Sequence, residues 1–386
     1  MGRYVLDDQS WTIERDGARL TITDVDGATR VEELADAKAA TTRFTVLTNQ
    51  KLRAGWKLWQ PPAEPREAKP LPEAPIVFDA REPSLEAAIL ADPEAIEPYL
   101  VYADWLQTKG DPRGELIARH AALHADPNNP KLKQMVQARI SRFADYFSGG
   151  FYAENTNYGY DWGFIQHASF DVDDEVGSIV EFLPRLLTVP SARFLLCLHL
   201  RDDGNRRELE RALPIVAERV PATLRRLRLR GTAWLGDLDA LETRLPALRR
   251  LGLMTAMGAR CLELLARVPL PRLEALEVAC NGGDEPLLVP MLVRRDLPAL
   301  VELTLVARMT EDLCNALAVA PIAQQLELLE LRGLDVGGTR RLLAILDAFP
   351  KLNRIGVYER RIDPAMYADL AARVRVYDID EDSDDD

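Results

Sequence analysis

The sequence predicts an α/β protein whose main part is a solenoid of parallel strands and helices, preceded by a small helical domain and a small α+β domain. Three observations support this prediction. One apolar pattern recurs seven times between residues 195 and 357, and its copies begin 24 to 29 residues apart. Stretches with helical apolar spacing lie between the copies, and a proline-rich stretch separates a short N-terminal region from the rest. A period in the twenties is typical of arrays in which each unit buries its apolar face against its neighbours.

Each copy consists of an apolar residue, two variable residues, an apolar residue, one variable residue and a last apolar residue. The last two apolar positions are two residues apart, so their side chains point to the same side of a short strand. Helical spacing follows, as at Leu262, Leu265 and Val268, so we expect right-handed crossovers between parallel strands. The copies start at Leu195, Leu224, Leu248, Leu273, Leu300, Leu326 and Leu352.

This pattern resembles the ribonuclease-inhibitor-like branch of the leucine-rich repeats, which implies strands on a concave side and helices on a convex side. That family places Asn or Cys three residues after the last apolar position, where it bonds the turning backbone. Only Asn281 fits, so irregular loops are expected after the strands. The corresponding positions are Asp203, Thr232, Ala256, Asn281, Arg308, Leu334 and Arg360.

Residues 1–60 are expected to form a small α+β domain. Trp11 and Ile13 alternate with polar residues, and Leu20 and Ile22 do so after a short turn, which predicts a hairpin. A helix should follow, from about residue 34 to residue 51. The opening SWTIERDGARLT and the closing KLRAGWKLW resemble a bacterial WGR domain, but Ile-Thr-Asp replaces the tripeptide that names it. In the nucleic-acid-binding members, the Trp and Arg of that tripeptide help to meet the ligand. Because both are missing here, we expect a degenerate domain that serves packing or protein contact.

Residues 81–146 are expected to form a helical domain. Asp111 and Pro112 mark a helix start, with the Asp as N-cap and the Pro in the first turn. The segments YADWL (102–106) and GDPRGE (110–115) resemble the repeat-companion domain of myxobacterial and planctomycete proteins, which sits just ahead of leucine-rich repeats. The resemblance implies an architecture and no activity. We interpret the charged residues of GDPRGE as helix caps and an ion pair between two helices.

The remaining boundaries follow from composition. Residues 61–80 form a linker whose first fifteen residues include six prolines, and residues 378–386 form an acidic tail with seven acidic side chains among nine. Neither has apolar periodicity, so both are expected to stay extended or disordered. The solenoid with its N-terminal cap then occupies residues 147–377.

Eight aromatic residues lie within nineteen positions at the start of this region. They could form a stacking platform for sugars or bases. The interpretation that we favour is that they fill the join between the helices and a capping half-repeat at Ile165, Ala168 and Phe170. The eight are Tyr146, Phe147, Phe151, Tyr152, Tyr158, Tyr160, Trp162 and Phe164.

Composition argues for an intracellular, cytoplasmic protein. The chain has four widely spaced cysteines without a CxxC pair, no signal-peptide core at its start and no stretch of membrane-spanning length. A formal net charge of −13 argues against nucleic acid as a general partner.

Motifs for chemistry are weak. His120 and His124 lie four apart on a predicted helix, which is metal-ligand spacing, but no cluster supplies further ligands. We interpret them as an incidental pair on a surface helix. No nucleotide-binding or nucleophile motif follows a predicted strand. The sequence therefore predicts no catalytic residue, no metal site and no cofactor, and a protein that is not an enzyme.

The side chains that alternate with the core leucines are expected to face the concave side. Early strands present arginines, middle strands glutamates, and late strands arginine and tyrosine, which suits a protein partner. The alternative is a solvated surface whose charges pair across strands. We favour binding, because a row of adjacent arginines costs stability when it is unpaired. The alternation also points Cys197 and His199 outward. We therefore predict a protein-interaction module or adaptor, with nucleic-acid binding through the WGR-like domain and the arginines as the alternative; partner identity and oligomeric state are left open. The predicted partner-binding residues are Arg201, Arg226, Arg228, Arg230, Arg250, Glu277, Glu302, Glu330, Arg332, Arg354 and Tyr358.

Overall fold

The structure is a computed structural model that describes residues 2–6, 9–53, 57–58, 80–150, 156–172, 177–203, 208–232, 235–255, 257–280 and 283–379. The chain forms two compact units, Met1–Leu71 and Pro72–Asp386. The predicted linker, apart from Ala80, lies outside the described residues, as do residues 380–386 of the acidic tail.

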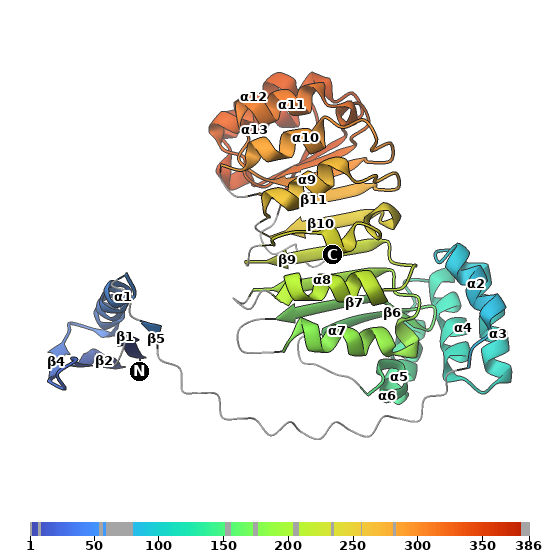
Figure 1. Cartoon of the computed structure of the whole chain (residues 1–386), viewed down its shortest axis with the longest axis horizontal. Coiled ribbons are helices and arrows are strands. Elements are labelled where there is room, and N and C mark those ends of the chain that lie inside the picture. Colours follow the sequence, from blue (N-terminus) through green and yellow to red (C-terminus); the bar gives the residue numbers. More distant parts are fainter. Residues whose placement is uncertain are drawn as a thin grey trace. The chain divides into compact units, whose positions relative to one another are not determined.

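In its described residues, the smaller unit contains a five-stranded antiparallel sheet and one helix (Figure 1). The predicted hairpin is confirmed, and Trp11, Ile13, Leu20 and Ile22 are buried together against the helix. The helix begins at residue 37 rather than 34, because the Asp36 side chain accepts a hydrogen bond from the N–H of Ala39 and so caps it. The elements are β1 Gly2–Leu6, β2 Gln9–Asp16, β3 Arg19–Thr23, β4 Thr29–Glu33, α1 Ala37–Arg53 and β5 Lys57–Leu58.

The larger unit begins with the predicted helical segment, which contains five helices. They are α2 Pro83–Ala91, α3 Ile96–Thr108, α4 Pro112–Ala125, α5 Pro130–Arg142 and α6 Ala144–Ser148.

A ten-stranded sheet follows, in which the strands lie in chain order from β6 to β15. Only β6 is antiparallel to its neighbour; every other neighbouring pair is parallel. The strands are β6 Thr156–Asp161, β7 Phe164–Val172, β8 Cys197–Asp202, β9 Arg226–Gly231, β10 Arg250–Met254, β11 Ala275–Ala279, β12 Glu302–Val306, β13 Leu328–Leu331, β14 Arg354–Val357 and β15 Arg375–Asp378.

Helices return the chain between most of these strands and cover one face of the sheet (Figure 1). The opposite face is called the open face below. The stretch between β9 and β10 contains two 3-10 turns in place of an α-helix among its described residues, Asp239–Leu241 and Leu245–Ala247. The helices are α7 Ile179–Thr188, α8 Glu208–Arg219, α9 Ala259–Arg267, α10 Val289–Leu292, α11 Glu311–Val319, α12 Val336–Ile345 and α13 Pro364–Ala371.

The seven predicted strands correspond to β8–β14, and their register aligns the core positions of the pattern. The last two apolar residues of every copy are buried in one continuous core beneath the helices. The expected capping half-repeat is also present, because β7 pairs with β8 so that Ala168 faces Leu198 and Phe170 faces Leu200. The loop positions Ala256 and Asn281 lie outside the described residues.

The aromatic side chains join the helical segment to the sheet, as we predicted. Trp162 and Phe164 are buried with Tyr99 and Tyr102 of α3 and with Phe194. Gln166 of β7 donates a hydrogen bond to the Tyr99 hydroxyl at 3.1 Å. These contacts place both parts on one apolar core, so they are expected to unfold together. Phe151 and Tyr152 lie outside the described residues.

The charged residues of GDPRGE act as helix caps and ion pairs, which confirms that interpretation. Asp111 caps α4 by accepting the N–H of Arg113 at 2.8 Å, and the Arg113 guanidinium pairs with the same carboxylate at 3.2 Å. Glu115 pairs with Arg139 of α5 at 2.6 Å and so ties two helices together.

The four cysteines are free thiols. Among the described residues, no helix combines the length and the apolar character that a membrane crossing requires.

Candidate functional site

The sheet register arranges the side chains of the open face in rows that cross the strands. One row contains Arg226, Arg250, Ala275, Glu302 and Leu328, one from each strand from β9 to β13. A second row lies two residues further along each strand and contains His199, Arg228, Gly252, Glu277, Thr304, Glu330, Gly356 and Tyr377.

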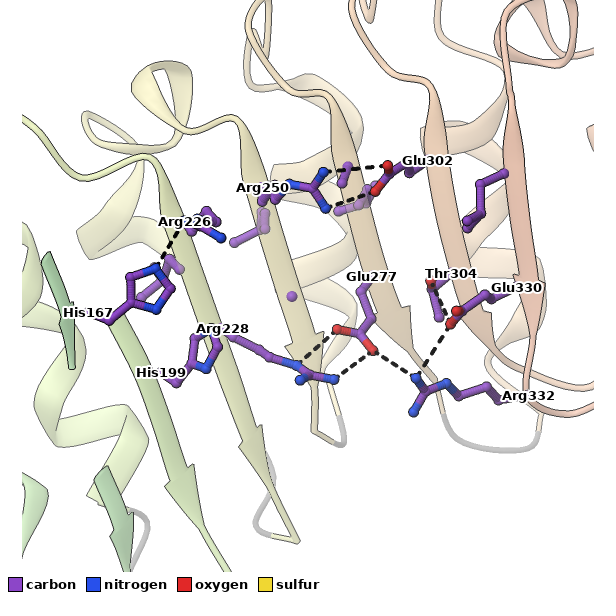
Figure 2. A pocket seen from close by; sticks show the side chains of 16 residues that line it. His167, His199, Arg226, Arg228, Arg250, Glu277, Glu302, Thr304, Glu330 and Arg332 are labelled. Carbon is purple, nitrogen blue, oxygen red and sulfur yellow. Dashed lines mark hydrogen bonds and ion pairs between the residues drawn. The ribbon is translucent and has the colours of Figure 1, made fainter. Parts of the chain in front are cut away.

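Oppositely charged side chains in these rows pair across an intervening strand, as Figure 2 shows. Arg228 of β9 and Glu277 of β11 approach to 3.0 Å across β10, where the intervening residue is Gly252. A Cβ atom at Gly252 would lie 2.8 Å from Cγ of Arg228 and 3.0 Å from Oε2 of Glu277. The pair therefore depends on the missing side chain at that position.

The same arrangement recurs on both sides of this pair. Arg250 of β10 and Glu302 of β12 meet at 2.8 Å across Ala275. Further along, the Tyr377 hydroxyl donates to Glu330 across Gly356. A small residue on the middle strand is thus a repeated feature of the open face.

Arg332 links two of these carboxylates. Its Nη2 atom lies 3.4 Å from Glu330 and 3.8 Å from Glu277. Thr304 adds a hydrogen bond to Glu330 at 3.2 Å. The guanidinium groups of Arg228 and Arg332 and the carboxylate of Glu277 are all largely shielded from solvent, with side-chain exposures of 11–17%. The network therefore holds its charges in fixed positions.

Replacing Glu277 by glutamine should destabilise the larger unit by about 1–3 kcal/mol, because two shielded arginines lose their shared carboxylate. Glu302→Gln is the matched control. Its partner Arg250 is 47% exposed, so that variant should cost at most about 1 kcal/mol. The measurement is urea unfolding of both variants, and equal losses would show that the shielded network contributes nothing beyond an ordinary surface pair.

The two open-face histidines are held neutral at one end of these rows. Arg226 donates to Nε2 of His167 at 2.9 Å, and burial together with this cation lowers the pKa of His167. Nε2 of His199 lies 3.2 Å from the Cys197 sulfur. Burial, followed by the charge of Arg228, lowers the pKa of His199 to about 4, and burial raises the pKa of Cys197 to about 11. A buried thiol of this kind is a poor nucleophile at neutral pH.

The stability of the larger unit is expected to fall as the pH drops from about 6.5 to about 4. In this window the unfolded chain binds a proton at His199 that the folded chain excludes, because the folded pKa is the lower one. His120 adds to the effect, since burial also lowers its pKa to about 4. Urea midpoints at pH 7 and pH 5 measure the drop. His199→Asn should make it smaller, and an unchanged drop would contradict the assignment.

The structure brings together some of the predicted residues and separates others. Arg228, Glu277, Glu330 and Arg332 form the shielded network, and Arg250 and Glu302 form the pair beside it. The other predicted residues lie around them. Arg201 pairs with Asp203 at 2.7 Å, and Arg226 contacts His167. Arg230 lines the rim of the face, Arg354 is exposed, and the Tyr358 ring lies under the Arg361 guanidinium.

Two expectations need correction. Cys197 is not exposed on the open face. Only 1% of its surface is accessible to solvent, and the His199 ring contacts its sulfur. His120 is not on a helix surface. It is 3% exposed, and its Nδ1 accepts the backbone N–H of Gly163 at 3.2 Å.

Sequence reasoning missed Tyr377 and His167 as parts of the open face. Extending the alternation one strand beyond each end of the array would have indicated both, because β7 and β15 keep the same register.

Hollows of ordinary ligand size lie along the open face. One of about 290 Å³ lies over the cross-strand pairs, and one of about 440 Å³ lies over β7–β9 beside His199 and Arg201. Another, of about 410 Å³, lies at the rim between Arg230 and Tyr358. Within the described ranges, no three His, Cys, Asp or Glu side chains are placed to hold a metal ion.

Comparison with known proteins assigns no family to this chain. No protein-family model matches the sequence, and no curated protein matches it. A crystal structure of a structural-genomics target from Bacteroides fragilis matches with a TM-score of 0.41 and 15% identity, over 99% of this chain and 97% of that one. A similarity of this degree says nothing about what the chain binds.

Proposed function

We propose that the larger unit is a leucine-rich-repeat solenoid of the ribonuclease-inhibitor-like type with a repeat-companion domain at 81–146, and that the smaller unit is a WGR-like domain at 1–60. The period of the apolar pattern, the parallel strands in chain order and the helices on one face support the first assignment. The motifs YADWL and GDPRGE support the second, and the hairpin followed by a helix supports the third.

The function that fits this architecture best is a non-enzymatic interaction module that binds a protein partner on the open face of β8–β14. The observation that carries the proposal is the network on the open face, in which an ion pair crosses Gly252 and a tyrosine–carboxylate hydrogen bond crosses Gly356. Side chains that are already fixed lose little conformational entropy when a partner binds. Arginine and tyrosine in such positions are frequent anchors of protein interfaces.

Charge pairing also favours protein over nucleic acid as the partner. Arg201, Arg228, Arg250 and Arg332 each have a carboxylate within 4 Å, so much of the positive charge is cancelled within the face itself. Nucleic-acid association is the weaker candidate, because it depends on uncancelled cations along a phosphate backbone.

The test is partner capture from the native cell with the full chain and with a triple Arg226→Glu, Arg228→Glu, Arg230→Glu variant. A control triple, Arg219→Glu, Arg260→Glu, Arg267→Glu, makes the same charge change on helices α8 and α9. We expect the open-face variant to lose at least about tenfold in captured partner and the control to keep it.

Folding of each variant is checked by thermal unfolding. Arg226→Glu alone guards against misfolding, because no carboxylate among the described residues pairs with Arg226. A partner list that is unchanged in the open-face variants would overturn the proposal. Retention of DNA or RNA in gel shifts at low salt would favour the weaker candidate instead.

A further inference from the structure

A cavity of about 830 Å³ lies where α4 and α5 meet the hairpin of β6 and β7. Its helical wall has an apolar part formed by Leu123, Val136 and Ile140, while Tyr158 and Tyr160 contribute rings from β6. Its volume is within the range of small-molecule sites, which combine apolar walls with a few polar groups. The proposed partner surface does not use this wall.

Three of the four histidines in the chain line this one cavity. His120 accepts a hydrogen bond at Nδ1 from the N–H of Gly163, so the neutral ring carries its proton on Nε2 as a donor. His124 stacks on Trp162 at a centroid distance of 4.4 Å. His167 accepts from Arg226. The chain thus gathers its histidines from two helices and a strand around a single hollow.

One acidic and one basic side chain line the cavity, Asp161 and Arg226, and they differ in their polar contacts. The carboxylate of Asp161 is already engaged, since its Oδ1 atom lies 2.9 Å from Nε2 of His124 and accepts the N–H of Trp162 at 2.9 Å. Arg226 is half-buried, and its described contact is with a histidine that carries no charge at neutral pH. No carboxylate of the described residues forms an ion pair with this guanidinium, so it can pair with the carboxylate of a ligand.

We propose that this cavity binds a small organic acid with an apolar body. The carboxylate would pair with Arg226, and the hydrocarbon would lie against Leu123, Val136 and Ile140. A guanidinium in a partly buried site favours a carboxylate because it donates two parallel hydrogen bonds. The site goes beyond the proposed partner surface, although Arg226 borders both.

The experiment is isothermal titration of the full chain with 4-phenylbutyrate and with 4-phenylbutylamine, which have the same hydrocarbon and opposite charges. The acid is expected to bind at least about tenfold more tightly than the amine. Arg226→Gln should remove this preference. Ser141→Trp, at an exposed position that lines the cavity, should abolish binding by filling it, whereas Gln134→Trp, exposed on the same helix outside the lining, should not.

Several results would overturn the proposal: no binding of the acid, equal or tighter binding of the amine, or full binding by a correctly folded Ser141→Trp variant. The last of these would mean that the acid binds elsewhere. Partner capture is measured separately with the same Ser141→Trp variant. This variant leaves the open face unchanged, so it should still capture the partner. A failure to bind the acid therefore does not contradict the proposed protein partner. An unchanged partner list in the open-face variants does not contradict the proposed acid site.

Discussion

Replacing Asp111 by asparagine is expected to lower the free energy of unfolding of the larger unit by about 3–5 kcal/mol. Arg113 is fully buried, and Asp111, which is 3% exposed, supplies the carboxylate that neutralises it. The guanidinium otherwise rests against the rings of Tyr146 and Phe164, at 4.7 and 5.6 Å from their centroids. Asparagine still caps a helix. The loss of stability therefore measures the cost of burying the Arg113 cation without its counter-ion.

The control is Asp363→Asn. Asp363 caps α13 by accepting the N–H of Ala365 at 2.9 Å, but it lies at an exposed position and forms no ion pair with an arginine of the described residues. This variant should cost no more than about 0.5 kcal/mol. Urea unfolding followed by circular dichroism compares the two, and similar losses would contradict the importance of the buried pair.

The second large effect is expected from Leu303→Ala at the centre of the sheet. Leu303 is fully buried in β12, between Leu276 on β11 and Leu329 on β13. Truncation should cost about 2–5 kcal/mol, because the transfer energy of the side chain is lost and a cavity remains. The loss of stability should extend to both neighbouring repeats, since each repeat is stabilised by the next.

Val319→Ala is the matched control, since Val319 ends α11 and is 77% exposed. It should change the free energy of unfolding by less than about 0.5 kcal/mol. Hydrogen exchange at the amides of β11, β12 and β13 shows how far the loss spreads. Loss of protection against hydrogen exchange in β12 alone would contradict coupling between neighbouring repeats.

The repeat array could be predicted because its physical cause lies in local sequence. Leu198 and Leu200 are two residues apart in the first copy, and both are buried in β8. The open face was harder to predict. The alternation identified Arg228 and Glu277, but their pairing depends on the register of β9, β10 and β11 together and on a glycine between them.

The cavity could not be predicted from sequence spacing. His120 and Gly163 are 43 residues apart, and their contact is set by how the helical segment packs against the hairpin. The short spacing between His120 and His124 suggested a pair on one helix. The third histidine of the group, His167, comes from β7, and no local pattern connects it to them.

The charge pairs that skip a strand also constrain how this protein could lengthen or shorten during evolution. Arrays usually vary by duplication or deletion of whole units. Removing the unit of β10 would place Arg228 directly beside Glu277, and duplicating it would set them three strands apart, beyond the reach of the present pair. Duplication or deletion of a repeat between β9 and β13 should therefore cost stability, because Arg228 and Glu277, Arg250 and Glu302, and Glu277 and Arg332 all depend on the present number of repeats.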